Sequence, residues 1–187
     1  MFPILTFKTP DEWYDWLEKN HAISDGVWLR FYKKGSGITG LTHATSLDGA
    51  LCYGWIDSQA KTLDEKSYLQ KYTPRRSKSI WSKVNTEHIA RLIKEGKMQP
   101  AGLAQVEAAK KDGRWDAAYN SPSNIVIPED FLKELAKDKK AEAFFNTLNK
   151  TNTYTIAWRL ETAKKPETRE RRMKVILEML SRGEKFH

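Results

Sequence analysis

The sequence is poor in the residues that hold metals and disulfides. It has one cysteine, Cys52, and four histidines, at positions 21, 43, 88 and 187, among 187 residues. A single thiol excludes an intramolecular disulfide and suits a reducing compartment. The histidines do not pair at ligand spacing, and with one cysteine a structural zinc site is disfavoured. We therefore expect neither a metal nor a cofactor.

Long apolar runs are missing as well. No stretch approaches the ~20 apolar residues of a membrane-spanning helix, and the mean hydropathy is −0.67. The N-terminal run MFPILTF is short, has no basic residue before it and is not followed by a small-residue cleavage site. We expect a cytoplasmic protein without membrane insertion.

Glycine-rich phosphate loops are also absent. The segment GSGITG at 35–40 only loosely resembles the dinucleotide-binding fingerprint, because it lacks the strand–turn–helix setting that gives that motif its meaning. A flexible hairpin tip is the simpler interpretation.

The sequence is rich in aromatic residues and in positive charge. The chain has 7 Trp, 7 Tyr and 7 Phe, which indicates a packed core, and a net charge of +8. Residues 61–120 hold 13 Lys and Arg against 7 Asp and Glu. Such a field favours nucleic acid, a small anionic ligand or an acidic protein as partner. Lysine-rich helices that only keep a protein in solution would give the same composition.

The periodicity predicts an α+β protein. Val27, Leu29 and Phe31 alternate with polar or amphipathic neighbours, as in a strand, and further strands are expected at 55–63 and 67–73. A helix is expected after Thr9-Pro10, and from residue 85 onward the pattern is helical. We predict a small antiparallel sheet with helices in an N-terminal lobe, 1–120. A helical lobe, 121–187, follows a loop at 120–124, and the two lobes are expected to pack as one unit.

Two segments, 52–59 and 72–85, carry the candidate site. Trp55 and Asp57 fall on one side of the expected strand, which predicts a wet face with an aromatic platform. In the second segment Arg75, Arg76 and Lys78 precede Trp81, with serines between them. Guanidinium groups suit phosphate or carboxylate, and a tryptophan plane suits a ring.

An antiparallel hairpin over 55–73 would bring these two segments to one end of the sheet. Arg75, Arg76 and Lys78 would then hold an anion, Trp55 and Trp81 would stack on a ring, and Asp57 would orient a hydroxyl or pair with an arginine. The alternative at even weight is structural: an Asp57–arginine bridge clamps the loop and Trp81 caps the core.

Four stretches resemble a known family. GWIDSQ, PRRSKSIWSKVN, EGKMQPAGLAQVEAAKKDGRWDAAY and WRLETAKKPETRERRMKVILEMLSRGEK are similar to the bacterial YdeI/OmpD-associated family, also called bacteriocin-protection proteins. The resemblance runs from about Trp13 to Lys185. It implies association with an outer-membrane porin and resistance to antimicrobial peptides, and it supplies no catalytic residues.

Three functions follow from the residues, in order of preference. The first is a binding protein for a small anionic, ring-containing ligand in a stress or antimicrobial-resistance response. The second is a nucleic-acid-binding protein. The third is an enzyme with Asp57 as general base. Cys52, in an apolar stretch, is interpreted as a small buried residue. The oligomeric state is left open.

Overall fold

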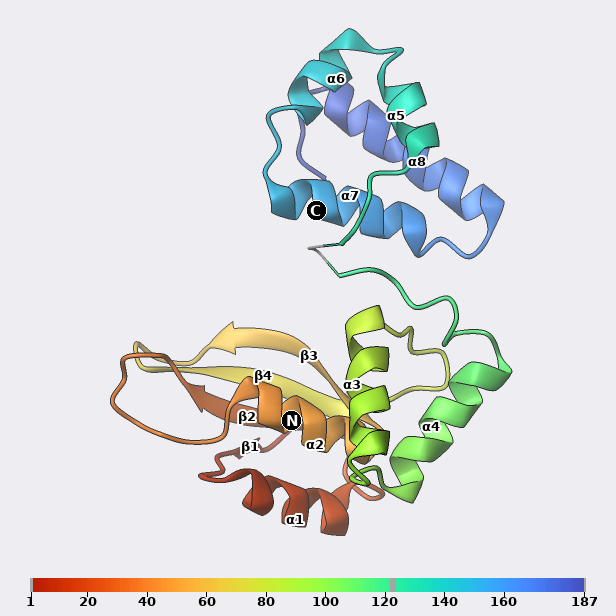
Figure 1. Cartoon of the computed structure of the whole chain (residues 1–187). Helices are drawn as coiled ribbons and strands as arrows, with labels where there is room; N and C mark the ends of the chain where they lie inside the picture. The colour runs from red at the N-terminus through yellow and green to blue at the C-terminus, as the bar shows by residue number, and fades with distance from the viewer. Residues whose placement is uncertain (1, 122–123, 187) are drawn as a thin grey trace. The chain divides into compact units, whose positions relative to one another are not determined.

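The computed structural model describes residues 2–121 and 124–186, which include every predicted element but neither His187 nor all of the predicted loop 120–124. The chain divides into two compact units (Figure 1). Unit 1 comprises residues 1–81 and 85–117, and unit 2 comprises residues 82–84 and 118–187. The α+β class is confirmed, with the strands in the N-terminal half.

Four strands and eight helices follow one another along the described chain. They are β1 (Ile4–Leu5), α1 (Pro10–Asn20), β2 (Val27–Tyr32), α2 (His43–Cys52), β3 (Trp55–Thr62), β4 (Ser67–Pro74), α3 (Lys83–Lys94), α4 (Pro100–Lys111), α5 (Glu129–Leu135), α6 (Lys139–Phe145), α7 (Lys150–Glu161) and α8 (Pro166–Ser181).

The sheet of unit 1 has the strand order β1-β2-β4-β3. β2 and β3 each pair antiparallel with β4, but β1 pairs parallel with β2. The predicted antiparallel sheet is therefore a mixed one. The two-residue strand Ile4–Leu5 is too short to show an alternating pattern, so it was not predicted.

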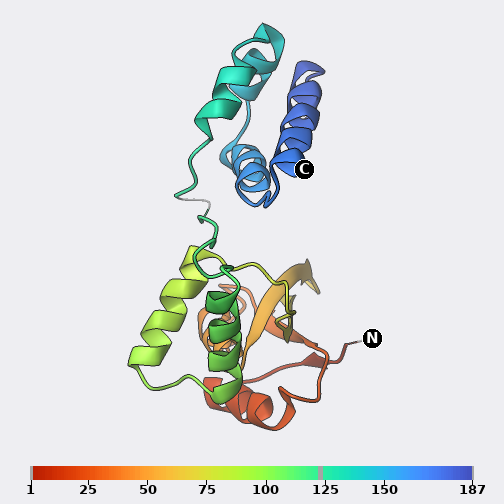
Figure 2. The same ribbon diagram turned by 90° about the vertical axis from the view of Figure 1, so that its right-hand side faces the viewer.

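One face of the sheet forms the core of unit 1. Val27, Leu29 and Phe31 are buried and alternate with partly exposed residues, as predicted. They pack with residues of α1, α2, β3 and β4, namely Trp13, Leu17, Ala50, Trp55 and Tyr72. Helices α1 and α2 lie on this face, whereas the opposite face carries no described helix of unit 1 (Figure 2).

Side-chain caps decide where the first helices begin. Thr9 accepts a hydrogen bond from the Glu12 amide and Pro10 occupies the first turn, as predicted. Helix α2 is capped by Thr42, whose side chain accepts a hydrogen bond from the Thr45 amide. The Ser46 hydroxyl is 2.7 Å from the Tyr72 hydroxyl, inside the core.

Glycine allows α4 to lie directly against the end of α2. A Cβ at Gly102 would stand 2.2 Å from the Cys52 carbonyl oxygen, and the Gln99 amide donates to that same oxygen at 3.1 Å. The inward face of α4 is thus Gly102, Val106 and Ala109. Leu103, the residue after Gly102, is not part of this inward face and is 39% exposed.

Unit 2 has its own apolar core, built by α5, α6, α7 and α8. Its buried members are Phe131, Leu135, Ala141, Ile156, Leu160, Ile176 and Leu180. One face of α8 contributes to this core, since Ile176 and Leu180 are buried and Met173 and Leu177 pack against the cluster. Among the described residues, no helix is both long and apolar enough to span a membrane.

Candidate functional site

The two predicted segments do meet at one end of the sheet. In the β3–β4 hairpin Trp55 lies opposite Pro74 and Asp57 lies opposite Tyr72. Beyond the last pair, the Arg75 amide donates to the Gly54 carbonyl at 3.0 Å. The hairpin argument from the sequence is confirmed, but the side chains that it brings together have other surroundings than predicted.

The rings of Trp55 and Trp81 are both buried, with an exposed fraction of 1% each. Trp55 lies on the inner face of the sheet, edge-on to Trp16 of α1, and its indole donates to the His21 carbonyl at 3.1 Å. The expected wet face is therefore wrong at Trp55, because α1 covers that side of β3. Trp81 packs against Trp115, with ring centroids 5.0 Å apart.

Buried cations make segment 74–81 a structural clamp. The Arg75 guanidinium, 6% exposed, lies 3.5 Å from the centre of the Trp81 ring and donates to the Ile80 carbonyl. Arg114, equally buried, donates to the Ser79 carbonyl at 2.9 Å and to Asp112 at 2.7 Å. These contacts agree with a structural role for Trp81, which is buried between Arg75 and Trp115.

Arg76 and Lys78 are exposed on the turn that follows β4. The Arg76 amide donates to the Ser79 hydroxyl at 3.0 Å, which fixes the turn while leaving both cationic side chains at the surface. Their role in holding an anion stays a prediction.

Asp57 is held by a histidine rather than an arginine. Its carboxylate lies 3.0 Å from the His43 Nε2 and accepts from the Gln70 side chain at 3.3 Å. The side chains of His43 and Asp57 are 44% and 25% exposed. The hydrogen bond with Asp57 raises the pKa of His43 above its ordinary value, against the opposing effect of burial. His43 therefore carries positive charge over a wider pH range than a free histidine.

His43 also borders a groove of unit 1 with a volume of about 680 Å³. The loop between β2 and α2 forms one wall, and aromatic rings of β2 and β4 form the other. The groove is lined by residues 31–43 and Tyr68. Lys33 and Lys34 are exposed at its edge, while Tyr32 and Tyr68 are half-buried. Cations and ring surfaces are thus combined in one concave place.

The amino-terminal end of α2 adds to the positive field of this groove. Thr42 and His43, which line it, are the cap and the first residue of the helix. Within the described parts of the chain the amides of His43 and Ala44 have no acceptor, whereas those of Thr45 and Ser46 bond to Thr42. The helix dipole and free amides favour an anion there.

The sequence analysis missed this groove because segment 35–40 was interpreted only as a flexible tip. The available signal was Lys33-Lys34 before the glycines and a helix-capping threonine directly after them. The pairing of His43 with Asp57 could not be seen, since fourteen positions and a helix separate the two residues.

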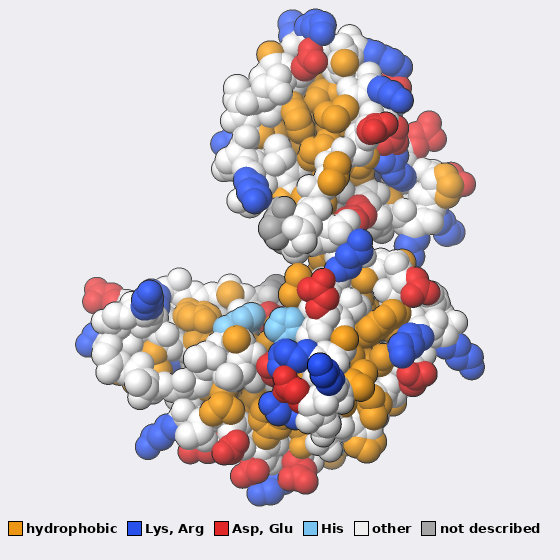
Figure 3. Space-filling model, viewed as in Figure 1, with side chains coloured by type: hydrophobic (Ala, Val, Ile, Leu, Met, Phe, Trp, Pro, Cys, Tyr) orange, Lys and Arg blue, Asp and Glu red, His pale blue; other side chains and the backbone are white. Residues whose placement is uncertain are grey.

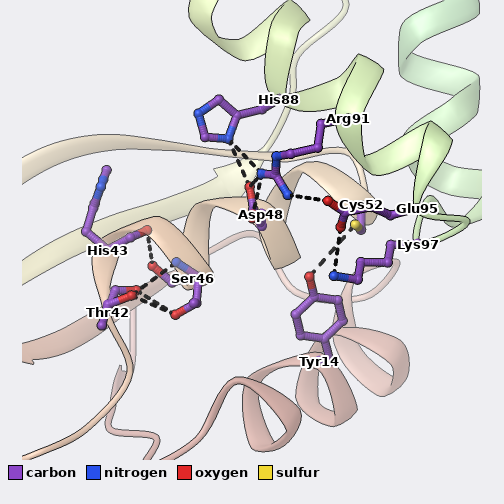
Figure 4. Close-up of polar contacts among 11 residues, drawn as sticks. Tyr14, Thr42, His43, Ser46, Asp48, Cys52, His88, Arg91, Glu95 and Lys97 are labelled. Carbon is purple, nitrogen blue, oxygen red and sulfur yellow. Dashed lines mark hydrogen bonds and ion pairs between the residues drawn. The ribbon is translucent and has the colours of Figure 1, made fainter.

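A second polar network joins α2 to α3 (Figure 4). The Asp48 carboxylate accepts from His88 at 2.9 Å and from Arg91 at 2.6 Å, and Arg91 also contacts Glu95. Burial raises the pKa of Asp48, but the hydrogen bonds from Arg91 and His88 outweigh it and hold the pKa below its ordinary value. Histidine side chains lie beside charged ones on this face of unit 1 (Figure 3).

Cys52 lies under this network, fully buried, with its sulfur 4.0 Å from the Tyr14 hydroxyl (Figure 4). Burial raises the pKa of the Cys52 thiol to about 11 and raises that of the Tyr14 phenol as well. A protonated, enclosed thiol is a poor nucleophile. The interpretation of Cys52 as a small buried residue is confirmed by its burial.

Fold and groove define a two-unit α+β protein whose candidate site lies in its N-terminal unit. The chain belongs to the family of a domain of unknown function (DUF8412), which matches residues 5–105, and carries a match to the bacteriocin-protection, YdeI or OmpD-associated family at residues 124–183. The predicted resemblance is confirmed for the second range, whereas GWIDSQ and PRRSKSIWSKVN fall in the first. Searches of the curated proteins and of the solved structures found no match.

Proposed function

We propose that unit 1 binds a small anionic ligand that carries a ring, in the groove between residues 31–43 and Tyr68. The observation that supports this is the combination of lysines, a helix amino terminus and aromatic rings around one cavity of about 680 Å³. The volume falls in the range of small-molecule sites. The ligand class is the one predicted from the sequence, but the site is a different one.

A ligand in the groove makes two kinds of contact, one with its anionic group and one with its ring. Lys34 attracts the anion, together with the free amides at the start of α2, and His43 adds to this attraction at any pH at which its imidazole is protonated. Tyr32 and Tyr68 offer ring surfaces, and Tyr68 is itself stacked on Phe31 with centroids 5.4 Å apart. Asp57, which is not part of the lining, acts by keeping His43 oriented and charged.

The test is a calorimetric screen of the full chain with nucleoside monophosphates, aromatic carboxylates and sugar phosphates. Each is compared with its neutral ring and its ring-free anion. We expect binding that needs both parts and that weakens at least tenfold, or ~1.4 kcal/mol, in Lys34→Ala and in His43→Gln.

The control is the double variant Arg76→Ala/Lys78→Ala, which removes the two exposed cations of the anion site predicted from the sequence. It is expected to bind as the unchanged protein does. If that variant alone loses the ligand, the anion site is the one predicted from the sequence and the groove is not involved.

We further propose that binding serves resistance to antimicrobial peptides. The support is the description of the family matched by residues 124–183. Expression of the chain in a sensitive bacterium should raise the bacteriocin concentration needed to stop growth, and His43→Gln should remove that gain. If the unchanged protein and His43→Gln protect equally, the groove is not needed for resistance.

A further inference from the structure

The face of the sheet turned away from α1 and α2 is lined by aromatic and cationic side chains. On β2 the outward positions are Trp28, Arg30 and Tyr32, all partly exposed. On β4, Lys71 lies opposite Trp28 and Leu69 lies opposite Arg30. On β3, Lys61 lies on the other side of Leu69. No described helix of unit 1 packs over these side chains (Figure 2).

Each aromatic ring on this face has a cation against it. The Lys61 ammonium lies 4.4 Å from the centre of the Trp28 ring, and the Lys71 ammonium lies 4.5 Å from that of Phe2. The Arg30 guanidinium lies 5.1 Å from the Tyr32 ring. These distances are within the range of attraction between a cation and an aromatic face.

The face is positively charged. Lys61, Lys71 and Arg30 supply three positive charges, and Asp64 at the β3–β4 turn lies 2.8 Å from Arg30. Because Asp64 pairs with Arg30, it offsets the charge of that cation rather than those of the two lysines. The remaining field attracts phosphates, while the rings beneath are surfaces on which planar groups stack.

We propose that this outer face, formed by Phe2, Trp28, Arg30, Tyr32, Lys61 and Lys71, binds single-stranded nucleic acid. A strand of RNA or DNA supplies phosphates and unpaired bases together at short, regular intervals, which matches cations interleaved with rings on an open sheet. A duplex keeps its bases stacked inside and would use only the charges. Tyr32 also borders the groove proposed above, whereas the other five residues do not line it, and the proposal does not depend on the ligand of the groove.

The flexible lysines can move aside when nucleic-acid bases stack on the rings. In the free protein Lys61 and Lys71 lie over the rings that the bases would occupy. Their four-carbon stems let each ammonium group swing to a neighbouring phosphate when a base replaces it. Arg30 is more constrained, because it also donates to the buried Ser67 hydroxyl at 3.0 Å. It therefore holds the Tyr32 side of the face in place.

The test is fluorescence anisotropy of the full chain with labelled 12-nucleotide oligo(dT) and oligo(U), over a salt series. The double variant Lys61→Glu/Lys71→Glu is expected to bind at least tenfold more weakly than the unchanged protein. The double variant Lys61→Gln/Lys71→Gln should lower the slope of log K against log salt by about 1.4, the value for two phosphate contacts on a single strand.

Trp28→Leu tests stacking, with an expected loss of about fivefold or more and little change in salt slope. If that variant melts early, the lysine variants still decide the matter, because Lys61 is exposed and its replacement leaves the core intact. The matched control is Lys133→Glu/Lys174→Glu in unit 2, which makes the same charge change on exposed helix positions.

Two binding patterns, and the absence of binding, would overturn the proposal. One is equal affinity for a 12-base-pair duplex and for the single strands, since the rings would then play no part. The other is binding that survives in Lys61→Glu/Lys71→Glu but is lost in the control or in Lys34→Ala. Absence of any binding at low salt would count as the same refutation.

Discussion

At the scale of single residues, surroundings decide the role of each side chain more than its type does. Trp55 and Trp28 are both on strands, yet the first is 1% exposed beneath α1 and the second lies on the open face. His43 and Cys52 are the two ends of one helix, and only the histidine borders a groove. The burial of each ionisable side chain also sets its pKa.

The pair formed by His43 and Asp57 makes stability depend on pH. Because the pKa of His43 is raised in the folded chain, its stabilising effect is present in full below the ordinary value of about 6.5. The effect is lost as pH rises through the folded value. Asp57→Asn should thus lower the free energy of unfolding more at pH 6 than at pH 9.

Urea unfolding at the two pH values measures this difference, and a nuclear magnetic resonance titration of the His43 ring gives its pKa directly. In Asp57→Asn the titration midpoint should move down. An unchanged midpoint would mean that the 3.0 Å contact does not exist in solution.

The thiol of Cys52 is expected to be unreactive while the chain is folded. A pKa of about 11 instead of 9.0 lowers the thiolate fraction about a hundredfold at pH 8, and full burial slows access further. Ellman's reagent should therefore label the native protein at least about a hundredfold more slowly than the urea-unfolded chain. Comparable rates would contradict the burial of this side chain.

At the scale of elements, glycine sets how closely helices approach. A Cβ at Gly102 would fall 2.2 Å from the Cys52 carbonyl, a backbone atom that cannot move aside. Gly102→Ala should then destabilise unit 1 by roughly 1–3 kcal/mol, the usual cost of overpacking. Thermal or urea unfolding measures it.

The matched control is Gly40→Ala, where the nearest atom to the added methyl is at 3.6 Å, an ordinary contact. That variant should unfold within about 0.5 kcal/mol of the unchanged protein, as surface substitutions generally do. Similar losses in both variants would mean that α4 does not approach α2 so closely.

Elements also show where local sequence was sufficient. The alternation of Val27, Leu29 and Phe31 and the Thr9-Pro10 helix start were predicted correctly, because each depends on neighbours within a few positions. The burial of Trp55 was not, because it depends on Trp16 of α1, some forty positions away. The short parallel strand β1 likewise exists only through its pairing with β2.

At the scale of the whole molecule, two separate apolar cores predict two folding units. Unit 1 has a core around Trp13, Val27 and Tyr72, and unit 2 has one around Phe131, Ile156 and Ile176. A fragment of residues 1–120 should therefore fold by itself, with one cooperative thermal transition. A fragment that is disordered by circular dichroism would show that unit 1 needs unit 2.

Charge is the other property of the whole molecule, and its total was read directly from the sequence. The net value of +8 and the concentration of cations in residues 61–120 predicted an anionic partner. The total could not show which cations are available. Arg75 and Arg114 are buried inside unit 1, where they contact carbonyl groups and an aromatic ring. Lys34, Lys61 and Lys71, in contrast, border surfaces that a ligand can reach.

Local sequence was enough to predict the α+β class, the strands of the hairpin and the meeting of segments 52–59 and 72–85, because alternation, caps and turns act between near neighbours. Three other features depend on tertiary packing: Trp55 and Trp81 are buried, His43 rather than an arginine pairs with Asp57, and no described helix of unit 1 covers one face of the sheet. These outcomes depend on which distant element covers each side chain, and burial by a distant element leaves no trace in local periodicity.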